Sequence, residues 1–371
     1  MPHLDGMNYA PEGKPSPVCG PGDFPFAAVH LDHGHIYGQC NGLIEAGGTL
    51  RWVYDPEPSR VKEFCQRYPQ ATPAANLDQI LEDPSIKLVT AAAVPSQRGR
   101  LGCHIMAAGK DYFTDKTPFT TLGQLEEARQ VAARTRQKYM VYYSERLHVE
   151  CAVFAGQLIE QGAIGRVFQT IGFGPHRLNA ASRPGWFFER ASYGGILCDI
   201  GSHQSEQFLF YTGARNAEVN HSAVANFSNP QYPELEDFGE VSLTADNGAS
   251  GYYRVDWSTP DGLRSWGDGR TFIFGSKGTI ELRKYIEISA ENPEGDQLYL
   301  VDETGEYRIS CAGKVGYPFF GQLILDCLHR TETAMTQEHA FKAAELCLKA
   351  QSMAMRLSES SNALYNQGFR Q

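Results

Sequence analysis

From Phe26 to Tyr143 the sequence alternates short apolar runs with segments of helical periodicity, and this alternation constrains the fold more than any other feature. Strands are expected at 26–31, 49–54, 87–92, 111–114 and 139–143. Helices are expected at 35–46, 57–67, 76–82, 97–108 and 122–137. Strands that alternate with helices are typical of a doubly wound parallel sheet, whose ligands bind at the carboxyl ends of the strands. We therefore predict an α/β domain over residues 25–148.

The pattern differs on either side of this domain. Residues 1–24 are rich in Pro and Gly, which predicts an extended arm without regular structure. Residues 149–371 predict an α+β domain with a large, mostly antiparallel sheet. Its strands are expected at 167–173, 217–228, 237–245, 250–258, 270–275, 278–289, 296–302 and 305–310. Its helices are expected at 149–161, 195–211, 317–330 and 337–357, and the last two could pack back on the first domain.

Composition excludes several classes of protein. The 371 residues carry a formal net charge of -10 without a block of Lys and Arg, which argues against binding to nucleic acid or anionic membranes. The apolar stretches fall short of the roughly 18 residues that a membrane span needs. Nine cysteines without a C-x-x-C pair argue against a disulfide framework and a structural zinc site, so we expect no metal. The start of the chain does not read as a secretion signal, and we expect a cytoplasmic protein.

Three motifs carry a resemblance to a known family. They are Asp115-Lys116-Thr117-Pro118, the run Gly194-Gly195-Ile196-Leu197-Cys198-Asp199-Ile200-Gly201-Ser202-His203, and Gly275-Ser276-Lys277-Gly278-Thr279-Ile280. From about Phe26 to Leu357 the chain resembles the glucose–fructose oxidoreductase and inositol dehydrogenase family (Gfo/Idh/MocA). The resemblance implies an N-terminal Rossmann domain that binds NAD, with NADP also possible. It also implies a small-molecule substrate and a homodimer or homotetramer.

The first turn of the Rossmann domain departs from the usual glycine pattern. A G-x-G-x-x-G turn lets the backbone approach a pyrophosphate, but here Asp32 stands at the second glycine position. Either Gly34 approaches the phosphates in a differently shaped turn, or cofactor binding is altered or lost. His33 and His35 either donate N–H groups to phosphate or face solvent from a loop. Asp32, His33, Gly34 and His35 are the candidate residues of this turn.

Three further residues are candidates for contacts with the cofactor. Asp55 ends the second strand about 20 residues beyond the turn, where a carboxylate accepts hydrogen bonds from the adenosine ribose and favours NAD over NADP. The alternative is that Asp55 only begins a turn with Pro56. Pro95 follows the strand at 87–92, where the family's backbone lies against the nicotinamide ribose. Lys116 is expected near the nicotinamide ring.

Oxidation of an alcohol needs a base for the hydroxyl proton and a positive group beside the developing alkoxide. Lys116 can hold the reacting oxygen, and His203 is the candidate general base. Asp199 lies four residues before His203 on an expected helix, so both side chains face the same way. A lone His on a helix more often belongs to the core or the surface, but the pair of Asp199 and His203 favours catalysis.

The second domain should contribute the substrate contacts. The candidates are Arg146, His176, Arg177, Arg183 and Trp186, with a core position for Trp186 and solvated positions for Arg177 and Arg183 as the alternatives. Three functions remain open. The first is an NAD-dependent dehydrogenase of a sugar, cyclitol or related polyol. The second is a glycoside hydrolase or lyase that retains its cofactor, and the third is a non-catalytic protein that binds a sugar or the cofactor.

Overall fold

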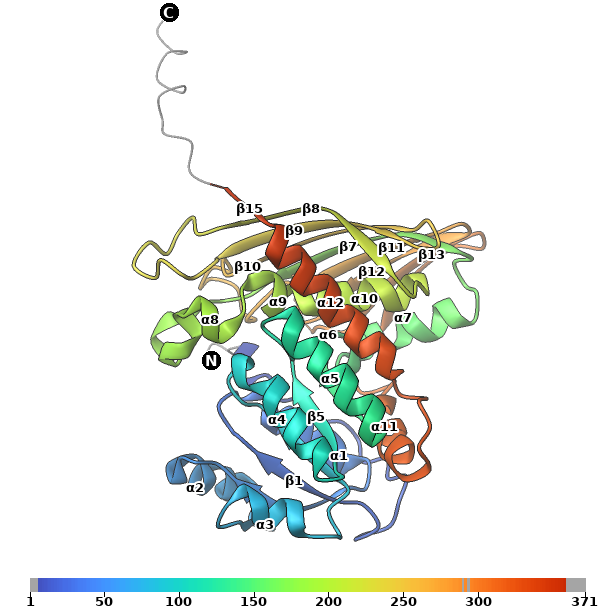
Figure 1. The fold of residues 1–371 in the computed structure, drawn as a ribbon. Helices are drawn as coiled ribbons and strands as arrows, with labels where there is room; N and C mark the ends of the chain where they lie inside the picture. Colours follow the sequence, from blue (N-terminus) through green and yellow to red (C-terminus); the bar gives the residue numbers. More distant parts are fainter. Residues whose placement is uncertain (1–5, 289, 292–293, 358–371) are drawn as a thin grey trace, which may run out of the picture.

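Two β-sheets lie in separate layers, and helices fill the space between them (Figure 1). The computed structural model describes residues 6–288, 290–291 and 294–357. The first sheet has six strands from the first part of the chain, and the second has nine strands from the remainder. This arrangement confirms the predicted α/β domain followed by an α+β domain. The boundaries near residues 24 and 148 remain predictions.

The first sheet is parallel, with the strand order β3-β2-β1-β4-β5-β6. Its strands are β1 (Pro25–Val29), β2 (Thr49–Tyr54), β3 (Thr72–Pro73), β4 (Leu88–Ala91), β5 (Asp111–Asp115) and β6 (Tyr139–Tyr142). Its helices are α1 (His35–Glu45), α2 (Pro58–Arg67), α3 (Leu77–Glu82), α4 (Pro95–Ala107) and α5 (Leu122–Thr135). Every residue of β1, β4, β5 and β6 is buried, as expected for parallel strands covered on both faces. The short strand β3 was not predicted.

Local side chains explain where several helices begin and end. Asn76 caps α3, because its side chain accepts a hydrogen bond from the backbone N–H of Gln79 at 2.9 Å. Thr121 caps α5 in the same way through the N–H of Gln124 at 3.2 Å. Gly109 follows the end of α4 with a φ of 79°, a backbone conformation that glycine adopts without steric cost.

The second sheet has the order β14-β13-β12-β11-β7-β10-β9-β8-β15. Its strands are β7 (Val167–Pro175), β8 (Ala217–Ala225), β9 (Phe238–Ala245), β10 (Ser250–Asp256), β11 (Arg270–Gly275), β12 (Gly278–Arg283), β13 (Gln297–Asp302), β14 (Glu306–Ser310) and β15 (Met355–Arg356). Only the pairs β7–β10 and β8–β15 are parallel among the described strands, so the sheet is mostly antiparallel, as predicted. The strand expected over 278–289 already ends at Arg283, and residue 289 lies outside the described residues.

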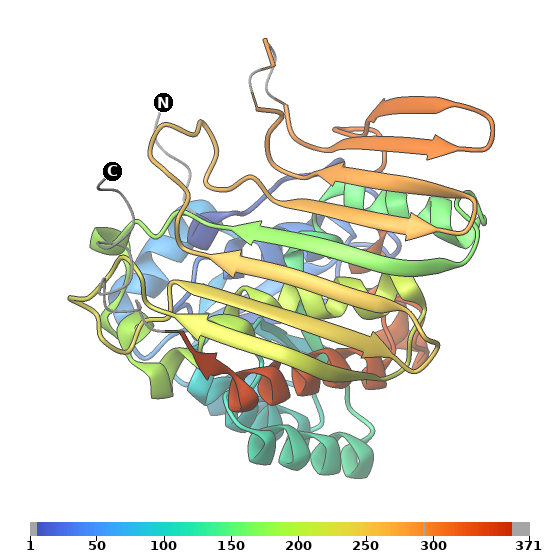
Figure 2. The same cartoon turned by 90° about the horizontal axis from the view of Figure 1, so that it is seen from above.

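Helices of the second half, apart from α11, cover one face of this sheet, and Figure 2 looks onto the other, open face. The helices of the second half are α6 (Ser144–Leu147), α7 (Glu150–Glu160), α8 (Arg190–Tyr193), α9 (Ile196–Asp199), α10 (Gly201–Thr212), α11 (Pro318–His329) and α12 (Gln337–Met353). The single helix predicted over 195–211 is therefore two helices. Ile200 separates them but keeps helical backbone angles, which preserves the spacing between Asp199 and His203. None of the helices in the described part is long and apolar enough to cross a membrane.

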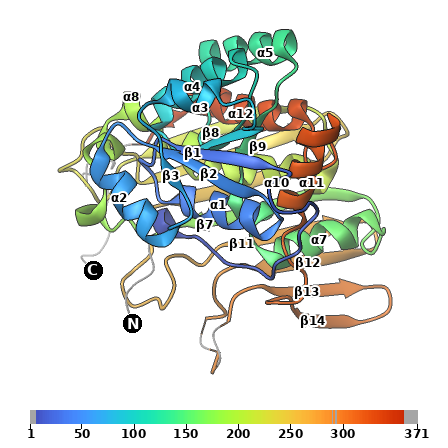
Figure 3. The same ribbon diagram turned by 90° about the horizontal axis from the view of Figure 1, so that it is seen from below.

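The helix α11 packs against α1 of the first domain (Figure 3). The ring of Phe320 lies where a side chain on Gly42 would stand, because a Cβ added to Gly42 would be 2.4 Å from that ring. Just beyond α11, Arg330 pairs with Asp111 at 2.6 Å. The segment that follows β14 is thus anchored to the first sheet.

The N-terminal arm is packed rather than free. Gly6–Asn8 forms a short 3-10 helix, which corrects the prediction that the arm lacks regular structure; residues 1–5 lie outside the described residues. Farther along, the backbone N–H groups of Ser16 and Val18 donate to the carbonyls of Glu45 and Ala46, both at 2.9 Å. The arm therefore runs beside α1. Its hydrogen bonds to the end of α1 satisfy backbone N–H groups of the arm.

His148 is buried where α6 meets α11. Its Nδ1 lies 2.5 Å from the hydroxyl of Tyr142, and its ring packs against Tyr317 and Phe320 at centroid distances of 4.2 and 4.8 Å. Burial in this aromatic setting lowers the pKa of His148 to about 3. The ring is therefore neutral in the folded protein near neutral pH.

The close contact of α1 with α11 leads to a prediction about stability. We expect Gly42→Ala to lower the free energy of unfolding by about 1–3 kcal/mol, because the new methyl group would overlap the Phe320 ring. Gly123→Ala is the matched control, since its Cβ would have 3.9 Å to the nearest atom; we expect a change between zero and about 1 kcal/mol of stabilisation. Urea unfolding measures both, and equal effects would contradict the packing argument.

The burial of His148 predicts a stability that depends on pH. The folded-state pKa of about 3 lies below the usual value of 6.5, so between these values the unfolded chain binds a proton that the folded chain does not. Stability should therefore fall as the pH decreases below about 6.5. We expect His148→Phe to reduce the slope of unfolding free energy against pH, between about pH 6.5 and 5, by up to about 1.4 kcal/mol per unit. An unchanged slope in urea titrations would contradict this assignment.

Candidate active site

Lys116, Asp199 and His203 lie together where the parallel sheet meets the second domain. Lys116 follows β5 directly, at the carboxyl end of that strand. Asp199 ends α9, and its Oδ1 is 2.5 Å from Lys116 Nζ, although the two residues are 83 positions apart. His203 stands in the first turn of α10 and is buried. The structure therefore brings the three predicted catalytic residues into one region.

His203 is neutral in this setting. Burial lowers its pKa well below the usual value, and the charge of Lys116 and the His176 ring act in the same direction, whereas Glu145 opposes them. Within the described part of the chain, His203 Nδ1 has no hydrogen-bond partner. A neutral imidazole can accept a proton, so His203 has the protonation state of a general base.

A second buried ion pair, which the sequence analysis did not assign to the site, lies close to His203. Glu145 is the second residue of the short helix α6, which follows β6. Its Oε2 accepts hydrogen bonds from Lys284 Nζ at 2.7 Å and from Gln204 Nε2 at 2.9 Å. Burial alone would raise the pKa of Glu145, but Lys284 and His203 outweigh it and lower the pKa, so the carboxyl is ionised. The position of Glu145 after a parallel strand could have identified it, whereas we find no sequence signal for Lys284.

His176, a predicted substrate contact, stands beside this pair. Its Nε2 is 3.9 Å from Glu145 Oε1, and its ring packs against Trp266 at a centroid distance of 4.5 Å. Burial, with a contribution from Lys116, lowers the pKa of His176 to about 3. His176 is therefore a neutral ring between Glu145 and the tryptophan.

Arg98, which the sequence analysis did not single out, holds the backbone beneath Lys116. Its buried guanidinium donates to the carbonyl of Ala93 at 2.6 Å and to the carbonyl of Lys116, and it lies 3.3 Å from Asp115 Oδ2. Pro95, a predicted cofactor contact, is buried as the first residue of α4, one turn before Arg98. Arg98 thus joins the carboxyl ends of β4 and β5 and orients the segment that carries Lys116.

Two arginines that were predicted to contact the substrate, Arg146 and Arg177, bind groups of the protein. Arg146 binds Glu206 through two of its nitrogens and lies over the ring of Phe210. Both partners belong to α10, so the guanidinium packs against that helix. Arg177 donates to the carbonyls of Pro260 and Leu263 at 2.9 and 2.7 Å, which holds that loop. Both guanidiniums thus contact groups of the protein, their role as substrate contacts stays a prediction, and burial of Arg177 corrects the solvated alternative.

Arg183 and Trp186 belong to the segment between β7 and α8. Arg183 is buried, donates to the carbonyl of Leu178 at 2.9 Å and lies over the rings of Phe187 and Trp257, so the solvated alternative is wrong for this residue too. Trp186 is half-buried in the 3-10 helix Gly185–Phe188, and its ring lies 6.0 Å from that of Phe187.

Asp55, the residue predicted to bind the adenosine ribose at the end of β2, accepts hydrogen bonds from the protein itself. Asp55 is buried, and its carboxylate accepts from the N–H groups of Leu31 at 2.6 Å and Glu57 at 2.8 Å. Arg60 lies 3.4 Å from the same carboxylate and 2.5 Å from Asp32, the residue at the second glycine position. The repulsion expected between Asp32 and a phosphate is therefore offset in part by Arg60.

His33 and His35 are buried against Asp115, so neither faces solvent. His35 Nδ1 lies 2.9 Å from Asp115 Oδ1, and His33 Nδ1 lies 3.3 Å from Oδ2. His33 Nδ1 also accepts the backbone N–H of His35 at the start of α1. These three side chains are of metal-ligating types within 4.8 Å of one another, but the Arg98 guanidinium shares the Asp115 carboxylate and supplies positive charge there.

The residues in this arrangement do not form an open cradle for a dinucleotide. A helix N-terminus binds pyrophosphate through free N–H groups, but the N–H of His35 is taken by His33. The N-terminal arm covers the same turn, because a Cβ added to Gly34 would lie 2.5 Å from Asn8 Oδ1 and 2.6 Å from the carbonyl oxygen of Met7. The turn binds parts of its own chain where the pyrophosphate of a Rossmann domain lies.

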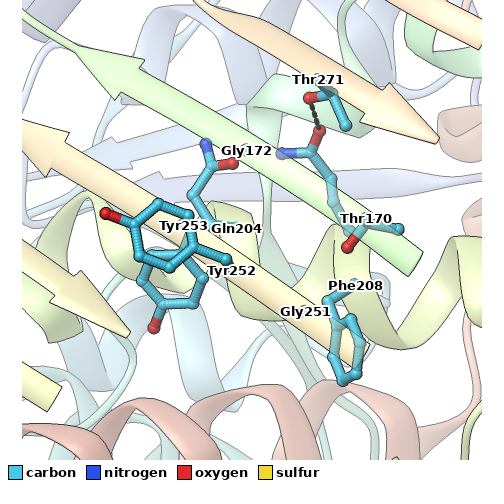
Figure 4. Close-up of a pocket in the computed structure, with 9 residues that line it drawn as sticks. Thr170, Gly172, Gln204, Phe208, Gly251, Tyr252, Tyr253 and Thr271 are labelled. Atoms are coloured by element: carbon cyan, nitrogen blue, oxygen red, sulfur yellow. Dashed lines mark hydrogen bonds between the residues drawn. The ribbon is translucent and has the colours of Figure 1, made fainter. Parts of the chain in front are cut away.

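A small space between α10 and the large sheet lies beside this site, because Gln204, which donates to Glu145, also lines it (Figure 4). Gln204, Phe208, Gly251 and Thr271 are among the residues that line it, and a hydrogen bond of Thr271 closes one side. Its volume of about 10 Å³ is enough for the centre of one water molecule and too small for a sugar.

Comparisons with known proteins agree with the fold and with the motifs. Residues 18–143 match a family described as "Oxidoreductase family, NAD-binding Rossmann fold", and residues 153–281 match the GFO/IDH/MocA C-terminal domain. The crystal structure of a putative oxidoreductase from Erwinia carotovora atroseptica SCRI1043 is 47% identical with a TM-score of 0.87, and the match covers 90% of this chain and all of that one.

Two curated relatives are more distant. A D-xylose dehydrogenase from Paenarthrobacter nicotinovorans is 25% identical over 39% of this chain and 38% of its own length. A scyllo-inositol 2-dehydrogenase (NAD(+)) from Bacillus subtilis (strain 168) is 24% identical over 63% of this chain and 66% of its own length. The matches thus span less than two thirds of each of these relatives. Together with the two family matches, they show that the chain belongs to the GFO/IDH/MocA family of oxidoreductases with an NAD-binding Rossmann fold.

Proposed function

We propose that the protein is an NAD(P)-dependent dehydrogenase that acts on a secondary alcohol of a sugar, cyclitol or related polyol. The observation that carries the proposal is the meeting of Lys116, Asp199 and neutral His203 at the carboxyl end of β5. Alcohol oxidation requires a positive group beside the reacting oxygen and a base for the hydroxyl proton. A lysine and a neutral imidazole within one buried site are groups of these two kinds.

Each residue has a separate task in this proposal. Lys116 places its ammonium beside the alcohol oxygen and stabilises negative charge that develops on it. Asp199 holds that ammonium in place through their 2.5 Å contact. His203 accepts the hydroxyl proton, which its neutral state permits. The nicotinamide of the family supplies the redox chemistry, and the residues described here supply proton transfer and charge stabilisation.

The cofactor preference and the assembly are parts of the same proposal. A carboxylate at Asp55 disfavours a 2′-phosphate, which supports NAD over NADP, and Arg60 beside it moderates that preference. The open face of the large sheet exposes apolar side chains such as Phe168 and Val301, which supports assembly of a homodimer or homotetramer through this face (Figure 2).

The proposed roles predict a loss of turnover in two variants. We expect His203→Ala to lower kcat by roughly 10²–10⁴-fold, because general base catalysis contributes about this factor. Lys116→Ala should cause a comparable loss by removing the charge beside the oxygen. The measurement is NADH formation from NAD with a panel of polyols and aldoses. His104→Ala, an exposed position on α4, is the control.

The same assay separates the proposal from its alternatives. Near-normal turnover in His203→Ala would show that another group is the base. Sugar release from glycosides without net NADH would favour the hydrolase or lyase, and failure of NAD and NADP to bind in calorimetry would favour a non-catalytic binding protein.

A further inference from the structure

Glu145 has one carboxylate oxygen that the protein leaves unpaired. Lys284 and Gln204 both donate to Oε2, whereas Oε1 has no hydrogen-bond partner among the residues described. The side chain is almost completely buried, so bulk solvent does not reach this oxygen. A buried acceptor without a partner is costly, and such groups commonly mark a position that a ligand or water completes.

The surroundings of Oε1 define what could complete it. His176 Nε2 is 3.9 Å away, and the Glu145 charge acts on the ring of His203, whose Nδ1 is also unpaired in the described structure. An ionised carboxylate only accepts hydrogen bonds, while an imidazole both donates and accepts. A hydroxyl group suits this pair, because it donates to one partner and accepts from the other.

Both lysines near Glu145 are already paired with carboxylates. Lys116 is paired with Asp199, and Lys284 is paired with Glu145. A carboxylate or phosphate group beside Glu145 would therefore meet an anion whose lysine partner is already engaged. A neutral hydroxyl group would add no charge and would satisfy Oε1.

We infer that Glu145 selects neutral polyhydroxylated substrates by accepting a hydrogen bond from a hydroxyl group next to the reacting alcohol, and that it discriminates against acidic sugars. This inference rests on the proposed function, because it places the substrate beside Lys116 and His203. Glu145 acts as a specificity residue, and Lys284 keeps its carboxylate ionised and oriented.

The test compares sugars that differ only in charge. Matched pairs of probes are D-glucose with D-glucuronate and D-galactose with D-galacturonate. We expect the wild-type protein to favour the neutral member at least tenfold in kcat/KM and in binding by calorimetry, and Glu145→Gln to reduce this ratio at least tenfold. The double variant Glu145→Gln/Lys284→Met removes both charges, so it controls for misfolding caused by an unpaired lysine.

Glu206→Gln is the matched control, because it removes another buried carboxylate that is paired with Arg146 away from the site. It should leave the ratio unchanged. Equal or stronger binding of the acidic sugars by the wild type, binding of neither kind, or an unchanged ratio in both Glu145 variants would overturn the inference. Selective binding of neutral sugars without turnover would support it while contradicting the proposed dehydrogenase.

A different observation carries a second inference, which concerns the N-terminal arm. The carbonyl of Gly6 lies 3.0 Å from His35 Nε2, and Asn8 and Met7 lie against Gly34 at the phosphate turn. The next residue, Tyr9, packs against Trp266 and Tyr285 of the second domain at 5.7 and 5.5 Å. One short stretch of chain therefore contacts both the first turn of the Rossmann domain and aromatic residues of the second domain.

We propose that this stretch, Gly6–Tyr9, competes with the dinucleotide for the first turn and must leave it for the cofactor to bind. The Tyr9 ring and its hydroxyl, which donates to the carbonyl of His148 at 3.3 Å, hold the arm in place. The Gly6 carbonyl is bonded to the His35 ring, and Met7 and Asn8 fill the space beside Gly34 that the phosphates of a dinucleotide would need.

The full-length protein tests this competition directly. We expect NADH to accelerate chymotrypsin cleavage after Tyr9 at least tenfold, because binding would release the tyrosine from its contacts with Trp266 and Tyr285. Tyr9→Ala should bind NADH at least threefold more tightly in a fluorescence titration, whereas Tyr307→Ala, an exposed tyrosine on β14, should bind as the wild type does. NADH binding without faster cleavage, unchanged affinity in Tyr9→Ala, or no binding by either protein would overturn the proposal.

Discussion

The contact between Lys116 and Asp199 is the interaction on which the site depends, because it joins the parallel sheet to the second domain. Lys116 follows β5 and Asp199 ends α9, and a further hydrogen bond from the Thr117 hydroxyl to the carbonyl of Cys198 lies beside them. Removal of two buried charges from water is costly, so such a pair persists only where the surrounding structure fixes both partners. Arg98 fixes the lysine side through the backbone, and the helix pair α9–α10 fixes the aspartate side.

Pairing of charges explains the chemistry that the site can support. Lys116 and Lys284 each have a carboxylate partner, and the buried histidines His176 and His203 are neutral because burial lowers their pKa. A site with paired lysines and neutral histidines can accept an uncharged alcohol and still provide a cation beside one oxygen and a base beside its proton. This combination suits proton transfer from a polyol better than the binding of an anion.

The fold could be predicted from the sequence in most of its parts. Short buried strands alternate with capped helices such as α3 and α5, and this local pattern specifies a parallel sheet with little ambiguity. The arm was predicted less well, because Pro and Gly indicate only the absence of long helices and strands. Its packing beside α1 depends on contacts between Glu45, Ala46 and residues about 30 positions earlier, which no local pattern reveals.

The sequence by itself determined the two-domain fold, the family motifs and the spacing of Asp199 and His203, because these features depend on periodicity and on neighbours along the chain. Only the tertiary structure decided which charged groups pair. Arg146 and Arg177 bind protein groups, whereas Glu145 and Lys284, which are 139 positions apart, form a buried pair beside the base. The tertiary structure also decided that the arm lies on the first turn. Partners of buried polar groups are set by distances in space, and a single sequence does not contain those distances directly.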